Sequence, residues 1–233
     1  MTDKHISSQF DADLTMISGR FMEMGGMAEN QIQLAIHALV ASDLESANEV
    51  IAGERRVNAM ELLIDRELTD IIARRQPTAR DLRLLMAVSK ATANLERVGD
   101  EADRIARMVK SIVNHGAPRT LPSQALRMAA DLSAGLLRKA LDAFARLDAS
   151  TAVSIMKEDA QIDAEFEAFL RQLIRYMMDD PRTITASLDL LFVAKAIERI
   201  GDHAKNIAEL IVYVVKGEDI RHSTMDRIES VVK

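Results

Sequence analysis

Apolar residues recur at spacings of three and four along most of the chain, which is the spacing of one face of an α-helix. In the first half this pattern predicts three long helices. The first covers residues 6–41, and Asp43 follows as the N-cap of a second helix that continues to Ile71. Pro77 stands in the first turn of a third helix, where proline is accepted, and that helix ends near Asn114.

The same pattern returns after a break. Residues 115–122 hold two prolines and a glycine between long helical stretches, so they are predicted to be a linker. A fourth helix begins near Ser123, and Asp148 is placed to cap a fifth. Pro181 opens a sixth helix, and Gly217 is suited to the left-handed position that ends it.

The two halves of the chain also repeat a specific signature. LERVGDEADRIA at residues 95–106 returns as IERIGDHAKNIA at residues 197–208, an offset of 102. Nearer the caps the offset is 105, because residues 43–47 align with residues 148–152. The sequence therefore predicts an all-α fold of two similar tandem three-helix bundles, each with its own core. The predicted domains are residues 5–114 and 123–217, with a linker at 115–122 and a polar C-terminal tail at 218–233.

Each copy of the signature places two carboxylates on the same side of one helix. Glu96 and Asp100 are four residues apart, as are Glu198 and Asp202. Like charges at this spacing destabilise a helix by roughly 0.2–0.5 kcal/mol, and the glycine between them costs about 1 kcal/mol relative to alanine. Because both costs recur at equivalent positions, we expect a cation to satisfy each pair.

The middle helix of each half carries a second polar pair, and the offset of 105 relates the two pairs. If the paired faces meet, each bundle gathers three or four oxygen ligands, which suit Fe, Mn, Mg or Ca, while Zn bound by carboxylates is also possible. The candidate metal-binding residues are Glu54, Asn58, Glu96, Asp100, Asp159, Asp163, Glu198 and Asp202.

A second interpretation needs no metal. Arg97 lies four residues before Glu101, and Lys205 lies three residues after Asp202, so the acidic faces also fit solvated helix surfaces with salt bridges. The glycine within each signature is also explained by a close contact between helices. Both interpretations stay open at the level of the sequence.

Composition narrows the classes of function. The chain has 233 residues, a net charge of −6 and no cysteine, which excludes thiolate catalysis and argues against broad nucleic-acid binding. There is no GxxxxGK or GxGxxG motif, and no Ser/His/Asp set can be singled out, so we predict no catalytic residues. No apolar run approaches the ~20 residues of a membrane span, and the start lacks the pattern of a signal peptide. We therefore expect a cytoplasmic location.

Several segments together resemble the PhoU family, the accessory regulators of the bacterial high-affinity phosphate transporter. The resemblance extends in order over nearly the whole chain, and the residues that carry it are 74–86, 95–100, 163–184, 197–202 and 213–222. The resemblance implies two three-helix bundles and clusters of iron or zinc at the ExxxD motifs. Asn58 departs from an all-acid pattern, so we expect the first site to be weaker than the second.

The resemblance also implies a role. Members act as negative regulators of the phosphate-starvation response and restrain phosphate uptake. They link the ATP-binding subunit of the phosphate ABC transporter to the phosphate sensor histidine kinase, and they are associated with homodimers. The prediction is a non-enzymatic cytoplasmic adaptor that meets the membrane only through these partners and binds no nucleic acid. The alternatives are a metal-dependent enzyme that uses the carboxylates and a metal-storage helical bundle.

Overall fold

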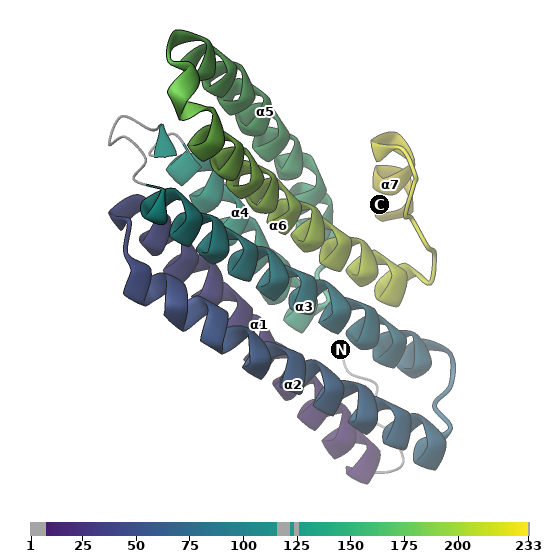
Figure 1. Cartoon of the computed structure of the whole chain (residues 1–233). Helices are drawn as coiled ribbons and strands as arrows, with labels where there is room; N and C mark the ends of the chain where they lie inside the picture. Colours follow the sequence, from purple (N-terminus) through teal and green to yellow (C-terminus); the bar gives the residue numbers. More distant parts are fainter. Residues whose placement is uncertain (1–7, 116–121, 124–125, 233) are drawn as a thin grey trace.

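The computed structural model describes residues 8–115, 122–123 and 126–232, and it confirms the all-α prediction (Figure 1). No strand occurs in these ranges. Residues 5–7 and 116–121, at the predicted domain start and in the predicted linker, lie outside the described residues. The elements are α1 (Ser8–Ala41), α2 (Leu44–Arg75), α3 (Ala79–Asn114), α4 (Leu126–Arg146), α5 (Ala149–Asp179), the 3₁₀ turn η2 (Pro181–Thr183), α6 (Ile184–Lys216) and α7 (Met225–Val232).

The predicted caps explain where the helices begin and end. The Asp43 carboxylate accepts a hydrogen bond from the Glu45 backbone N–H at 2.9 Å, and Asp148 does the same for the second residue of α5. Gly217 adopts φ 76°, the left-handed conformation predicted for the end of α6. Pro181 differs from its prediction, because it lies in η2 and α6 begins three residues later.

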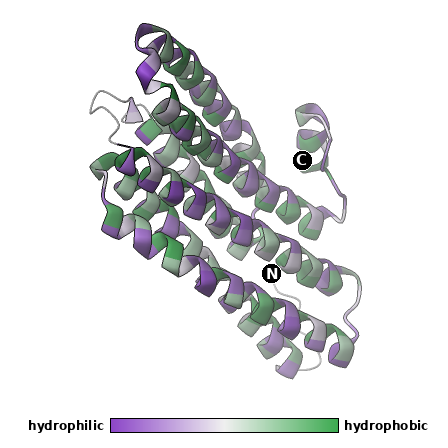
Figure 2. Cartoon of the chain, in the orientation of Figure 1, coloured by the Kyte–Doolittle hydropathy of each residue, from purple (hydrophilic) through white to green (hydrophobic). Residues whose placement is uncertain are grey.

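The helices form two three-helix groups, α1–α3 and α4–α6, that pack against each other. The most extensive contact joins α3 to α6, which run in opposite directions along the middle of the molecule (Figure 1), and α1 packs on α4. Hydrophobic and hydrophilic residues are interspersed along every helix (Figure 2). The buried residues are mainly apolar.

The apolar core is continuous between the two groups, and in this respect it differs from the predicted pair of separate cores. Phe21 on α1 and Phe144 on α4 place their ring centroids 4.7 Å apart. One turn away, a Cβ at Gly25 would lie 2.7 Å from Leu141 Cδ2, so the missing side chain lets the two helices approach closely. Apolar faces of α1 and α4 thus bury each other across the two halves.

The C-terminal segment also departs from its prediction as a polar tail, because it contains the helix α7. Ile220 and Ile228 are both buried, and α7 contacts α5 and α6. Lys157 on α5 forms an ion pair with Glu229 on α7, with Nζ and Oε1 2.6 Å apart. Two buried apolar side chains and an ion pair therefore hold this segment on the bundle. In the described part of the chain, every helix is too short or too polar to cross a membrane.

Candidate functional site

The predicted acidic pairs of the second half lie on adjacent helices, α5 and α6, and form what we call the second acidic cluster: Asp159, Asp163, Glu198 and Asp202. Gly201 brings these helices together, because a Cβ there would lie 2.7 Å from Ile162 Cδ1 on α5. Burial, followed by the charges of Glu198 and Asp159, raises the pKa of Asp202. The structure thus brings all four predicted residues within electrostatic reach of one another.

Two lysines on α6 accompany this cluster. Lys205 Nζ lies 2.9 Å from Asp159 Oδ2, and Asp159 is only 2% exposed. Burial is the largest single influence and lowers the pKa of Lys205, but the hydrogen bond to Asp159 and the charges of Asp159, Asp202 and Glu209 together raise that pKa above its ordinary value. Lys195 Nζ lies 2.6 Å from Glu198 Oε1. The second cluster therefore already contains positive charge in contact with its carboxylates.

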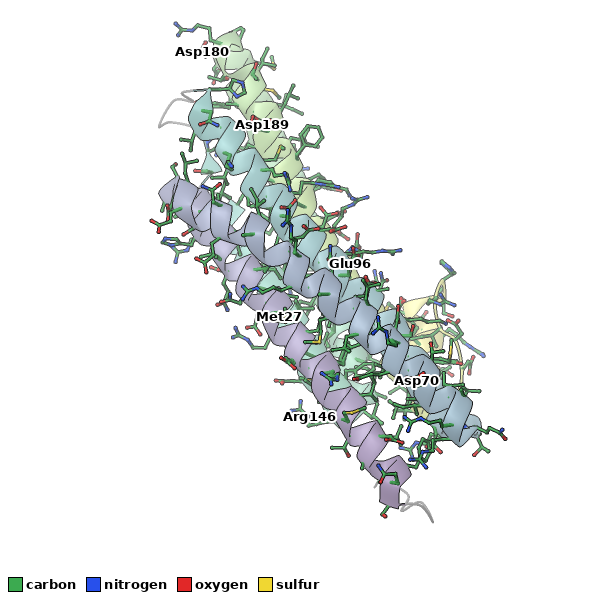
Figure 3. The ribbon with its side chains drawn as sticks, turned by 60° about the horizontal axis from the view of Figure 1, so that its bottom comes forward. Met27, Asp70, Glu96, Arg146, Asp180 and Asp189 are labelled. Atoms are coloured by element: carbon green, nitrogen blue, oxygen red, sulfur yellow. The ribbon has the colours of Figure 1, made fainter. Side chains whose placement is uncertain are left out.

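The first acidic cluster lies between α2 and α3 and consists of Glu54, Asn58, Glu61, Glu96 and Asp100. The Asn58 side-chain amide donates to Glu54 Oε1 at 2.9 Å, whereas Asn58 Oδ1 is buried and receives no hydrogen bond from the described residues. Burial comes first in raising the pKa of Glu96, followed by the charges of Asp100 and Glu61. Figure 3 labels Glu96 on α3. The predicted pairs of the first half therefore also meet.

Glu61 was missed in the sequence. Burial raises its pKa, and the charges of Asp65 and Asp100 add to the effect. It lies seven residues after Glu54, two helical turns along the same face, and this spacing was the available signal. The duplication did not mark it, because the position 105 residues later is Phe166.

The two clusters flank a groove of about 790 Å³ between α3 and α6, which Asp100 and Asp202 both line. Glu101, 4% exposed, accepts from Arg199 Nη1 at 2.9 Å across this groove and pairs with Arg104 at 3.2 Å. The i,i+4 pair predicted between Arg97 and Glu101 is therefore replaced by a contact between the two halves. The groove interior is a salt-bridged seam that joins the bundles.

A neutral histidine belongs to the same seam. His203 occupies the position equivalent to Glu101, and its Nδ1 lies 3.1 Å from Asn94 Oδ1. Asn206 Nδ2 donates to the same oxygen at 3.1 Å. Burial, aided by the charges of Arg97 and Arg199, lowers the pKa of His203 to about 4. Its ring is thus uncharged at neutral pH.

Comparisons with known proteins agree on one family. The model of the PhoU domain matches residues 21–109 and 126–211, one segment in each half. A Burkholderia protein described as a phosphate-specific transport system accessory protein PhoU homolog is 46% identical over 229 residues, 98% of this chain and 97% of the relative. The Escherichia coli K12 phosphate-specific transport system accessory protein PhoU is also 46% identical, over 99% of this chain and 95% of its own length. The chain belongs to the PhoU family.

Solved PhoU structures share the fold. The crystal structure of PhoU from Pseudomonas aeruginosa matches with a TM-score of 0.86 at 40% identity, over 90% of this chain and all of the other. PhoU from Streptococcus pneumoniae matches with a TM-score of 0.84 at 28% identity, over 90% of this chain and 98% of the other. The tandem bundle arrangement is therefore the PhoU fold.

The metal implied by the PhoU resemblance can be compared with the donors present. Within the described ranges, no group of three or more His, Cys, Asp or Glu side chains is arranged to hold a metal ion. The second cluster does not fit a resident metal, because Lys205 occupies the Asp159 carboxylate. The first cluster is not arranged as such a site either, but its oxygen donors, from Glu54, Glu96 and Asp100, are of the type that divalent cations prefer. The expectation that Asn58 makes the first site the weaker one stays a prediction.

Proposed function

We propose that the chain is a negative regulator of the phosphate-starvation response that also restrains phosphate uptake. It acts as a cytoplasmic, non-enzymatic adaptor between the ATP-binding subunit of the phosphate ABC transporter and the phosphate sensor histidine kinase. The observation that carries this proposal is similarity over nearly the full length, at 46% identity, to accessory proteins of the phosphate-specific transport system. The continuous two-bundle fold shared with solved PhoU structures supports it.

The regulatory role is tested with an alkaline phosphatase reporter of phosphate starvation. A deletion strain grown in abundant phosphate should show high reporter activity, and the intact gene should return it to the parental level. Reporter activity as low in the deletion strain as in the parent would refute the role. A strain lacking the transporter is a useful control, because it separates loss of signalling from loss of phosphate supply.

The partners are tested separately. The purified chain should copurify with the ATP-binding subunit and with the kinase, each in detergent-solubilised membranes from phosphate-replete cells. Retention of neither partner by a folded chain contradicts the adaptor model. Light scattering coupled to size exclusion should give the mass of a homodimer, and a monomer mass of 25.8 kDa at micromolar concentration would contradict that part of the proposal.

A divalent cation at the first acidic cluster is a further part of the proposal. Three carboxyl groups support it: Glu61, Glu96 and Asp100. Burial, followed by the charges of neighbouring carboxylates, raises the pKa of each of them. A bound cation would stabilise the ionised form of such groups. Elemental analysis of protein purified without chelator should find Fe, Zn, Mn or Mg. The double variant Glu96→Gln/Asp100→Asn should lose it, and equal trace metal in both proteins would refute the site.

A further inference from the structure

The two acidic clusters occupy equivalent places in the duplicated chain but differ in the cations beside them. α6 supplies Lys195 and Lys205 to the second cluster. The residues 102 positions earlier, on α3, are Ala93 and Asp103. Since the helices, the glycine and the ExxxD pair are common to both halves, the lysines are a specific feature of the second cluster.

Lys205 contacts the most buried carboxylate of the cluster. The Asp159 side chain is 3% exposed, and Lys205 Nζ lies 2.9 Å from its Oδ2. A buried carboxylate without a partner is strongly unfavourable, so Asp159 needs a cation at this point. The Lys205 side chain comes from α6 and is 38% exposed, which lets its aliphatic stem pack while the ammonium reaches α5.

The lysines serve the remaining carboxylates as well. The charge of Lys205 acts favourably on Asp163 and Asp202 in addition to Asp159. Lys195 contacts Glu198 at 2.6 Å. Between them, the two ammonium groups are attracted to all four members of the second cluster, which is the electrostatic task that a bound metal ion would perform.

A metal ion and Lys205 would compete for the same oxygen. Carboxylate oxygens bind hard divalent cations at about 2.0–2.6 Å, and the ammonium already stands 2.9 Å from Asp159 Oδ2. Positive charges placed that close repel each other strongly. We propose that Lys205 is the resident cation of the second acidic cluster, in the place where the family resemblance would put a metal, so that this cluster is complete without metal.

The proposal is independent of the adaptor role and is tested by counting bound Mn²⁺. Free Mn²⁺ gives an electron paramagnetic resonance signal that is lost on binding, so a titration yields the number of ions per chain. The informative variant is Lys205→Gln, because its amide still donates a hydrogen bond to Asp159 but carries no charge. The matched control is Lys216→Gln, an exposed lysine at the end of the same helix.

The wild type and Asp159→Asn should bind the same number of Mn²⁺ ions, because no metal uses Asp159 while Lys205 is present. Lys205→Gln should bind one additional ion per chain, and the double variant Lys205→Gln/Asp159→Asn should lose it again. Lys216→Gln should match the wild type. In thermal unfolding, Mn²⁺ should raise the Tm of Lys205→Gln by more than it raises the Tm of the wild type.

Two results would overturn the proposal. The first is that Asp159→Asn binds one Mn²⁺ ion fewer than the wild type, which would show that metal and lysine share the site. The other is a Lys205→Gln protein that binds no more Mn²⁺ than the wild type. Should Lys205→Gln fail to fold in chelator, folding restored by Mn²⁺ supports the proposal, and failure in Mn²⁺ as well counts against it.

Discussion

Replacing Phe21 with alanine tests the continuity of the core across the two halves. Phe21 is 1% exposed, and its ring lies 4.7 Å from that of Phe144 in the other half. Removing a fully buried phenylalanine ring costs about 3–5 kcal/mol of the free energy of unfolding. For a chain of this size each kcal/mol lowers Tm by about 2–4 °C. The expected decrease in Tm is therefore about 6–20 °C.

The assay is differential scanning calorimetry together with helical circular dichroism. Because the core is continuous, the lower Tm should appear in one transition that involves both halves. Phe192→Ala is the matched control, since that ring is 53% exposed and its removal should change stability by no more than about 0.5 kcal/mol. A second transition left at the wild-type temperature would show that the halves unfold independently. A loss no larger than that of the control would refute the assigned packing.

Three further changes probe local features. Gly99→Val and Gly201→Val should each cost about 1–3 kcal/mol by crowding the neighbouring helix, whereas Gly135→Val, which has open space around it, should be nearly neutral in chemical denaturation. Asp148→Ala should lower the free energy of unfolding by about 0.5–2 kcal/mol through loss of the N-cap of α5, and Asp148→Asn should be much milder. Hydrogen bonds lower the pKa of Asp148 in the folded chain. The stability difference between the wild type and Asp148→Ala should therefore fade as the pH falls below about 4. His203 has a pKa of about 4 in the folded chain and an ordinary value of 6.5. As the pH falls, the unfolded chain takes up the proton first, so stability should fall between pH 6.5 and pH 4. His203→Gln should flatten that part of a profile of Tm against pH, and an unchanged profile would refute the assigned burial.

Local signals in the sequence were sufficient for most of the fold. Periodicity and the caps at Asp43 and Asp148 predicted the long helices, because these features depend on residues near one another in the chain. The helix α7 was missed, since eight residues with one buried apolar side chain, Ile228, give too little periodic pattern. Its stability depends on the surface of α5, which no local pattern reveals.

The site shows the same division. The sequence was sufficient to predict that the acidic pairs meet, because helices that are neighbours in the sequence pack against each other antiparallel. The reach of Lys205 to Asp159 did not follow, because it depends on the distance between α5 and α6 that Gly201 permits. Lys205 was visible in the sequence only as a neighbour of Asp202 on one helix. The separate-core prediction failed for a similar reason, since Gly25 carries no apolar side chain to mark the contact that it allows.

The packing of the two halves has the form of a symmetric dimer within one polypeptide. Equivalent helices contact each other, α1 with α4 and α3 with α6, as in a two-fold interface between identical subunits. A protein made of one such repeat could build this interface from two identical chains, but both of its acidic clusters would then carry the same residues. Joining the repeats in a single gene removes that restriction. It allows position 205 to be lysine while its equivalent, Asp103, is acidic.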